Sequence, residues 1–431
     1  MSFRIGEAEI RKLTLKSSVS NLDVNVSPII VQVFVYEDLF SNFISSNISL
    51  LDGTSLQNML PIVGGEIVSM DVGTSGTDKG LRTLKSDFVV FKMSARERIK
   101  MDLEAYTLNL ITHEQLLDST MSINRAYIKP IHEIVKDIVT EYLTPISGKK
   151  LVSFEETKGI HNIIATGLTA SAFIQQLIRE AESTKHPSSI FVFYETIEGY
   201  HFHTIDGLYA QEPSHSFIYD ELALSPATPG ASASLNRNIA YLTIDNSFNL
   251  LNGQIGGQYK MQVSSFDPLT KTFQSNEYSY DKDFKENKYN NKTLGGSSLS
   301  KYFSNPTISK FIVTDSHRST INYITTNESD SQSIYRRRQD FMAKEQSTKM
   351  QYAAMRIHIS VPGNPDVIVG QTINVIIPKT DDTVGGKPKN DRLISGKYIV
   401  TAIAHKIDSN TGKYATVMEC MRKGYQERIE R

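Results

Sequence analysis

The residues of this 431-residue chain whose spacing best suits chemistry are two histidines, His201 and His203. Residues i and i+2 of a strand share one face, so both imidazoles could bind zinc if a third ligand joined them. No third ligand follows nearby, and we interpret the pair as the polar face of an antiparallel hairpin. His113 and Glu114 lack the second histidine of an H-E-x-x-H zinc site and fall at a strand end, so we assign them a structural role.

Other motifs that bind ions or phosphates are incomplete. Asp281 and Asp283 resemble the opening of a calcium loop, but the glycine and distal glutamate of that loop are missing. Four glycine pairs lack the context of a phosphate or dinucleotide loop and are predicted to be turn residues: Gly64-Gly65, Gly256-Gly257, Gly295-Gly296 and Gly385-Gly386. There is no G-x-S-x-G nucleophile elbow. We therefore assign no catalytic residue, no metal site and no cofactor, and expect no hydrolase activity.

Charge gives little reason to expect a nucleic-acid or membrane ligand. Lys and Arg number 46 against 47 Asp and Glu, a net charge of −1 that provides no long-range attraction for polyanions. The densest basic run, Arg336-Arg337-Arg338, could contact phosphate if it lined a channel. We interpret it as the solvated face of a helix whose Ile334, Phe341 and Met342 point inward.

The single cysteine, Cys420, excludes a disulfide framework within the chain and is predicted to be a small buried hydrophobe. Arg4 and Glu7 place charges where a secretory signal needs an apolar core. No later run approaches the roughly 20 apolar residues that span a bilayer, so we expect the protein to fold in cytoplasm without stable membrane insertion.

Alternating apolar and polar residues dominate residues 1–125 and predict short half-buried strands separated by turns. The spacing is typical of an all-β barrel or sandwich, with a helical turn over residues 54–59. The predicted strands contain residues 10–15, 30–36, 67–72, 88–93 and 105–111. Many short strands leave edges that a monomer must protect, and ring closure between subunits is one way to pair them.

Residues 126–212 predict a small α+β domain. An apolar stripe predicts an amphipathic helix that begins near Pro130 and is stopped by Pro145. A second helix is expected over residues 170–183 with Thr169 as its N-cap. Strands over residues 189–196 and 200–205 flank Glu198-Gly199 and predict a hairpin.

The rest of the chain predicts a second β-region with an insertion. Residues 213–252 begin it, residues 253–330 read as an irregular insertion with weak strands, and residues 331–431 add a helix and the closing strands. This second β-region joins residues 216–244 to residues 352–421, with a final hairpin across residues 408–412. The tail of residues 422–431 is too polar to pack in a core and is expected to be frayed or docked on a partner.

This order of elements, more than any single motif, resembles the baseplate hub proteins of contractile phage tails and the hub portion of type VI secretion spike proteins. The resemblance covers nearly the whole chain. It rests on Tyr36-Glu37-Asp38-Leu39-Phe40, residues 48–52, residues 61–66, Ser171-Ala172-Phe173 and Gly396-Lys397-Tyr398.

The resemblance implies a β-rich α+β fold with two tube-like antiparallel β-barrels, a small inserted α+β domain and an irregular insertion. It also implies a homotrimer of pseudo-sixfold symmetry, an adaptor that joins the hexameric tail tube to the trimeric membrane-puncturing spike. The implied location is the virion tail baseplate, which is assembled in the host bacterial cytoplasm. The implied further partners are wedge or other hub proteins. Nucleic acid would be met only as genome in transit through the lumen.

Two further expectations follow from the resemblance. The chain ends soon after its second barrel, so we expect a separate spike protein and no fused lysozyme. The alternative function is a β-rich, tail-associated enzyme that degrades cell wall or carbohydrate, which would need two carboxylates facing each other across a cleft.

Overall fold

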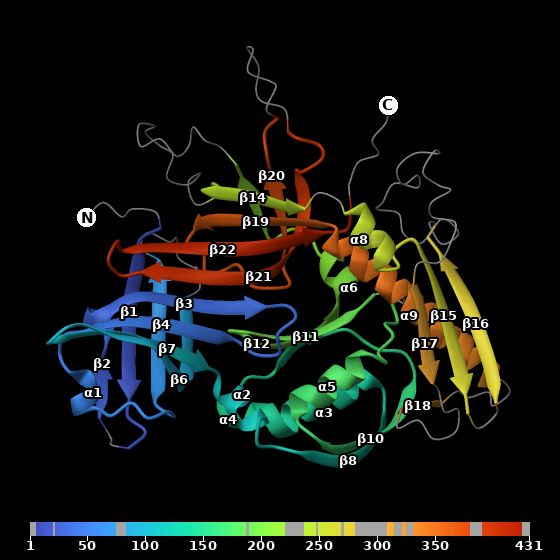
Figure 1. Cartoon of the computed structure of the whole chain (residues 1–431), viewed down its shortest axis with the longest axis horizontal. Helices are drawn as coiled ribbons and strands as arrows, with labels where there is room; N and C mark the ends of the chain where they lie inside the picture. The colour runs from blue at the N-terminus through green and yellow to red at the C-terminus, as the bar shows by residue number, and fades with distance from the viewer. Residues whose placement is uncertain are drawn as a thin grey trace.

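The dominant element of the fold is one large, mostly antiparallel β-sheet (Figure 1). The computed structural model describes residues 6–19, 22–74, 83–186, 189–219, 237–246, 249–268, 271–280, 308–313, 321–324, 331–379 and 390–424. Within these residues the chain is β-rich with few helices, as the sequence predicted. None of the described helices is both long enough and apolar enough to cross a bilayer.

The N-terminal half of the sheet uses the predicted alternating segments. Its elements are β1 (Ala8–Lys16), β2 (Asp23–Asn25), a 3-10 turn (Ser27–Ile29), β3 (Ile30–Asp38), β4 (Ser45–Asp52), α1 (Leu56–Met59), β5 (Ile67–Thr74), β6 (Leu84–Lys100) and β7 (Leu103–Ile111). Inward positions such as Leu13, Val33, Ile48 and Leu110 are fully buried and form a first core. The predicted strands and the turn of helix within residues 54–59 are confirmed.

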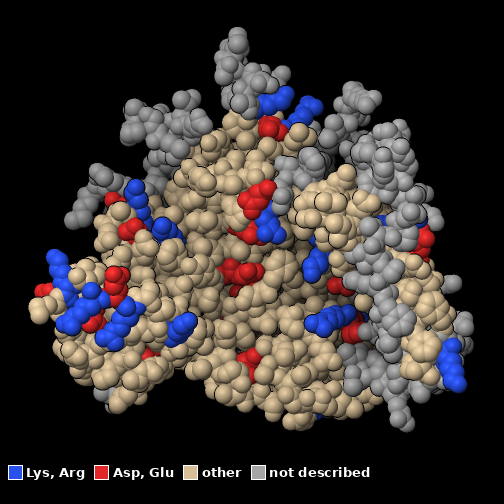
Figure 2. Space-filling view, viewed as in Figure 1, with Lys and Arg blue, Asp and Glu red and all other residues tan. Residues whose placement is uncertain are grey.

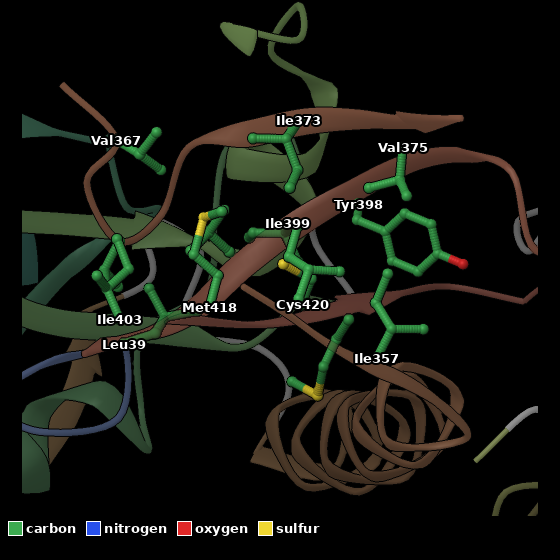
Figure 3. Packing of buried hydrophobic residues seen from close by; sticks show 14 of the residues in the cluster. Leu39, Ile357, Val367, Ile373, Val375, Tyr398, Ile399, Ile403, Met418 and Cys420 are labelled. Carbon is green, nitrogen blue, oxygen red and sulfur yellow. The ribbon is translucent and has the colours of Figure 1, made fainter. Parts of the chain in front are cut away.

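The C-terminal half forms a second core. Its strands are β13 (His215–Ile218), β14 (Tyr241–Asn246), β19 (Met355–Pro362), β20 (Thr372–Ile376), β21 (Gly396–Asp408) and β22 (Lys413–Arg422). Ile357, Ile373, Ile399 and Met418 converge from four strands on one apolar interior (Figure 3). Cys420 lies in this core and is fully buried, as predicted.

The two halves are joined by the pairing of β3 with β21, from Ala402↔Asp38 to Asp408↔Gln32. The β21–β22 hairpin serves both cores, because Ile407 and Tyr414 near its tip pack in the first core and its base packs in the second. Among the described residues the result is one continuous sheet without a closed barrel. The two-barrel architecture therefore stays a prediction.

The strand order of the two halves is the same. Along the sheet the path β3-β4-β7-β6-β5 takes five strands in chain order one, two, five, four, three, and β14-β19-β22-β21-β20 repeats that order. The halves differ in the next strand, since β1 is antiparallel to β5 whereas β13 is parallel to β20. The matching strand order required by a duplication is confirmed for these five strands.

The predicted α+β domain lies between the halves in sequence, and most of it lies in the lower centre of Figure 1. The helix α2 (His113–Asp118) precedes it. The domain itself, residues 126–212, contains the end of β8 (Ile123–Lys129), α3 (Ile131–Ile138), the π-helical turn η2 (Val139–Leu143), α4 (Thr144–Ser147), β9 (Leu151–Phe154), β10 (Ile160–Leu168), α5 (Ala170–Ile178), β11 (Phe191–Thr196), β12 (Gly199–Thr204) and α6 (Ile205–Ala210). Its helices and strands enclose a third core that includes Ile134, Phe173 and Phe202. The predicted N-cap is confirmed, because Thr169 accepts a hydrogen bond from the Ala172 amide at 3.2 Å.

Two predicted helix ends were wrong. Helical structure continues to Ser147 instead of stopping at Pro145, because the π-turn η2 places the proline in the first turn of α4, where its missing N–H costs no hydrogen bond. Helix α5 ends at Ile178 and not at residue 183.

The insertion is more regular than the sequence predicted. It begins within α8 (Leu250–Ile255) and contains the strands β15 (Lys260–Asp267), β16 (Thr272–Ser279), β17 (Ile308–Val313) and β18 (Ile321–Ile324). The helix predicted after it is α9 (Ser331–Ala353). Strands β16, β15 and β17 form a sheet that packs on α9, and β18 pairs with β10 of the α+β domain. The polar composition concealed these strands because one face of the sheet is solvated.

The prediction that residues from 422 onward cannot pack in a core was wrong for the first two. Arg422 is fully buried and Lys423 is only 6% exposed. The Arg422 guanidinium lies 5.0 Å from the centre of the Tyr398 ring and donates to the carbonyls of Ile394 and Ser395 at 3.3 and 3.0 Å. Residues 425–431 lie outside the described residues.

Replacing Arg422 with alanine should lower the free energy of unfolding by about 3 kcal/mol, because buried carbonyls lose their donors and the Tyr398 ring loses its partner. Urea denaturation followed by circular dichroism measures this loss. The matched control is Arg179→Ala on the exposed end of α5, which should stay within about 0.5 kcal/mol of the parent. Equal stabilities of the two variants would contradict a structural role for Arg422.

Candidate functional site

The two histidines lie on one face of β12, as predicted, and share one partner. Ser153 of β9 hydrogen-bonds with His201 Nδ1 and with His203 Nε2, both at 2.8 Å. His201 Nε2 also contacts the Thr196 hydroxyl at 2.9 Å. Hydroxyl groups thus occupy both ring nitrogens of His201.

Burial keeps these imidazoles neutral. Desolvation lowers the pKa of His201 to about 4, with a smaller contribution from His203, and desolvation also lowers the pKa of His203. Among the residues with described positions, no three His, Cys, Asp or Glu side chains gather where a metal ion could bind. The two histidines therefore form hydrogen bonds with neighbouring hydroxyl groups, and their geometry supports no further chemistry among the described residues.

The other candidate residues named from the sequence either have structural roles or lie outside the residues that the structure describes. Glu114, in the first turn of α2, is buried and accepts a hydrogen bond from Ser147. Gly64, Gly65 and Gly257 have positive φ, as turn glycines do. Arg336-Arg337-Arg338 belongs to α9, but the positions of its side chains are outside the described part of the chain, and so are Asp281, Asp283, Gly295-Gly296 and Gly385-Gly386.

A group of buried carboxylates, which the sequence analysis missed, lies where the three cores meet. Glu195 of β11 is fully buried, and its carboxylate pairs with the Lys149 ammonium. The same carboxylate accepts from the Ile44 amide at 3.0 Å, so it links the α+β domain to the segment between β3 and β4. Burial raises the pKa of Glu195, and Lys149 opposes that rise.

The second carboxylate of this junction is Glu37 on β3, which is 1% exposed. Its Oε2 accepts from the Val369 amide at 3.4 Å. Desolvation raises the pKa of Glu37 to about 7, although the backbone amides of Val369 and Ile197 favour the charged form. A sequence signal for this residue exists, because Glu37 occupies the inward register of Val33, Val35 and Leu39, where an apolar residue is expected.

Two strand edges of the main sheet, on part of β6 and on β14, are covered by no described strand. Strand β5 pairs with β6 only from Leu84 to Val89, so beyond Val90 one side of β6 carries no ladder within the described residues. At the other end β14 pairs with β19 alone, and Tyr241 is 63% exposed. Such edges are the parts of a sheet that can pair with another chain.

The projecting end of the β6–β7 hairpin carries most of the charge on its side of the molecule (Figure 2). Four basic and three acidic side chains lie close together there: Lys92, Arg96, Glu97, Arg98, Lys100, Asp102 and Glu104. Met101 at the tip is 91% exposed. Three register shifts between β6 and β7 and the positive φ of Ala95 bend this part of the strand.

Two solved structures with a similar fold are tail proteins. The tail protein from Neisseria meningitidis MC58 aligns with a TM-score of 0.53 and 11% identity over 96% of this chain and 97% of that chain. The 43 kDa tail protein of prophage MuSo2 from Shewanella oneidensis aligns with a TM-score of 0.53 and 10% identity over 96% and 98%. The E. coli c3393 protein, described as a component of the type VI secretion system, aligns with a TM-score of 0.44 and 12% identity over 98% and 80%.

No family model matches the chain, and no curated protein matches its sequence. The likeness to tail proteins therefore lies in the fold, and it spans nearly the full length of the first two structures. The resemblance inferred from the order of elements is confirmed at this level.

Lys149→Met should destabilise the protein on the order of 3 kcal/mol at pH 8, because it leaves the buried Glu195 carboxylate without its cation. A carboxyl whose pKa is raised by folding holds its proton more tightly in the folded state, so its contribution to stability falls as pH rises through the folded pKa. The loss should therefore be smaller at pH 5, where Glu195 can be neutralised.

Urea denaturation of the parent and the variant at the two pH values tests this expectation. Lys158→Met is the matched control, since Lys158 pairs with Glu182 at 2.9 Å on a more exposed site and should cost less than about 1 kcal/mol. A Lys149→Met loss that is the same at both pH values would contradict the assigned role of Glu195.

Proposed function

We propose that this protein is the structural hub of a contractile tail baseplate, a homotrimeric symmetry adaptor that joins the hexameric tail tube to the trimeric membrane-puncturing spike. The observation that carries the proposal is the repeated strand order within one continuous sheet. The fold shared with two tail proteins over almost their whole length supports it.

The repeat supplies what a threefold ring needs to meet a sixfold tube. Each chain contributes two four-stranded segments of equal strand order, β14-β19-β22-β21 and β3-β4-β7-β6. Three copies then offer six similar segments, one for each subunit of a hexameric ring. The sequences of the two segments share little beyond alternation, so the likeness lies in their topology.

The free edges supply a way to close the ring. All pairings from β14 through β19, β22, β21, β3, β4 and β7 to β6 are antiparallel. Eight strands is an even number, so β6 of one copy and β14 of the next also run antiparallel when they meet around a ring. Pairing of these edges would remove both from solvent, and pairing is one of the usual ways in which a protein protects an exposed sheet edge.

The further partners follow from the same role: a tail tube protein on one face, a central spike protein on the other, and wedge or other hub proteins around the ring. Assembly would take place in the host cytoplasm, and genome would pass through the lumen without specific binding. The near-zero net charge of −1 agrees with passage rather than retention of a polyanion.

A purified sample should be a homotrimer by light scattering, alone or when co-expressed with its spike. Ile244→Pro should convert it to a monomer while circular dichroism stays unchanged. Ile244 lies opposite Ile357, and the Gly363 amide donates to Tyr414 of β22, so by the alternation along β19 Ile357 bonds β22; the Ile244 amide therefore points away from β19 and proline leaves that ladder intact.

Phe273→Pro is the matched control, because it places proline on the outer edge of β16, away from the proposed ring contact, and the trimer should persist. The parent protein remaining a monomer both alone and with the spike would rule out the adaptor function.

We also propose that the chain has no enzymatic role. The arrangement closest to a catalytic one is Ser153 with His201 and His203. The nearby Glu155 cannot orient these rings as a triad acid does, since its oxygens accept from Ser183 and from the Thr204 amide and hydroxyl.

A zymogram on bacterial cell wall should therefore show no clearing by the protein, and Ser153→Ala should give the same result. Clearing by the parent that is lost on substitution of Ser153 or of a single carboxylate would favour the alternative, a tail-associated enzyme.

A further inference from the structure

Three segments far apart in sequence enclose the Glu37 carboxyl. One is β3 itself, the second is the turn that follows β11, and the third is the loop before β20, whose Val369 amide donates to Glu37. Ile197, in the turn after β11, packs against the first core. Tyr194, on β11 itself, belongs to the second core. The carboxyl therefore lies at the contact between the two halves of the sheet and the α+β domain.

The loop before β20 approaches β11 closely beside Glu37. A Cβ at Gly370, which has φ +86°, would lie 2.1 Å from the Tyr194 hydroxyl. Only glycine allows the loop to approach β11 this closely. Glu37 Oε1 is buried and makes no hydrogen bond, so the charged form of this carboxyl is poorly compensated.

The ionisable groups that face Glu37 come from each neighbouring element. Glu195 on β11 disfavours its charge and Lys149 favours it. Tyr194 on β11 and Tyr414 on β22 interact with its charge, and burial keeps both phenols protonated by raising the pKa of each. Since Lys149 is already paired with Glu195, none of these described groups is a cation dedicated to Glu37.

We propose that Glu37 is a proton-controlled latch between the modules. When the carboxyl is protonated, the turn after β11 and the loop of residues 366–370 stay packed on β3. When it is ionised, these two segments separate locally from β3 so that water can reach the charge. The main sheet remains intact in both states, because the β3–β21 ladder does not involve the carboxyl.

The sign of the effect follows from linkage. The pKa of Glu37 is about 7 in the folded state, above that of an exposed glutamate, so the closed contact binds the proton more tightly than the open one. The contact is then strongest at acid pH and weakens as pH rises through 7. Above that pH, opening relieves the buried charge.

Hydrogen exchange of the full-length protein at about pH 5.5 and 8.5, corrected for intrinsic exchange rates, tests the latch. Residues 191–199 and 366–371 should lose protection by roughly tenfold or more at the higher pH. Helix α3, in the third core, should not change and serves as the internal reference. Equal loss in α3, or no loss in the two segments, would overturn the proposal.

Glu37→Gln mimics the protonated carboxyl and should keep both segments protected at both pH values. Glu66→Gln is the matched control, since Glu66 is equally buried but accepts from the Val63 and Gly64 amides in the first half of the sheet. It should retain the pH dependence of the parent. A Glu37→Gln protein that loses protection as the parent does would also overturn the proposal.

Discussion

The pairing of β3 with β21 is the constraint on which the rest of the structure depends. These seven residue pairs join strands that lie more than 350 positions apart in sequence. They make one sheet out of two halves, and they place the tip of the β21–β22 hairpin in the first core and its base in the second. Neither half can therefore move far without breaking a ladder of backbone hydrogen bonds.

This constraint explains how the chain tolerates long connections. In the first half β3 and β4 are linked by a short turn, whereas their counterparts β14 and β19 are separated by the whole insertion. The entropic cost of closing a loop rises only slowly with the length of the loop. The pairing of β14 with β19 therefore tolerates the long insertion between them. The insertion returns to the body of the protein through β18, which pairs with β10, and through α9, which leads directly into β19.

The carboxylates at the junction contribute specificity at some cost in stability. Burying Glu37 and Glu195 is unfavourable compared with apolar side chains of the same size. Their contacts with Ile44, Lys149 and Val369 join particular segments at the junction, and for Glu195 a different arrangement would leave a buried charge without its cation. The same groups make the contact between modules sensitive to protonation, while the apolar cores on either side of it are not.

The sequence by itself determined the local elements: the alternating strands of the N-terminal half, the amphipathic helix after Pro130, the Thr169 cap and the buried Cys420. These depend on periodicity and capping, which act over a few residues. Only the tertiary structure decided the pairing of β3 with β21, the burial of Arg422 and the meeting of Glu37 with Val369. From the local sequence alone a charged residue is predicted to be exposed. It can be buried only where distant segments supply the carbonyls, amides and rings that contact it.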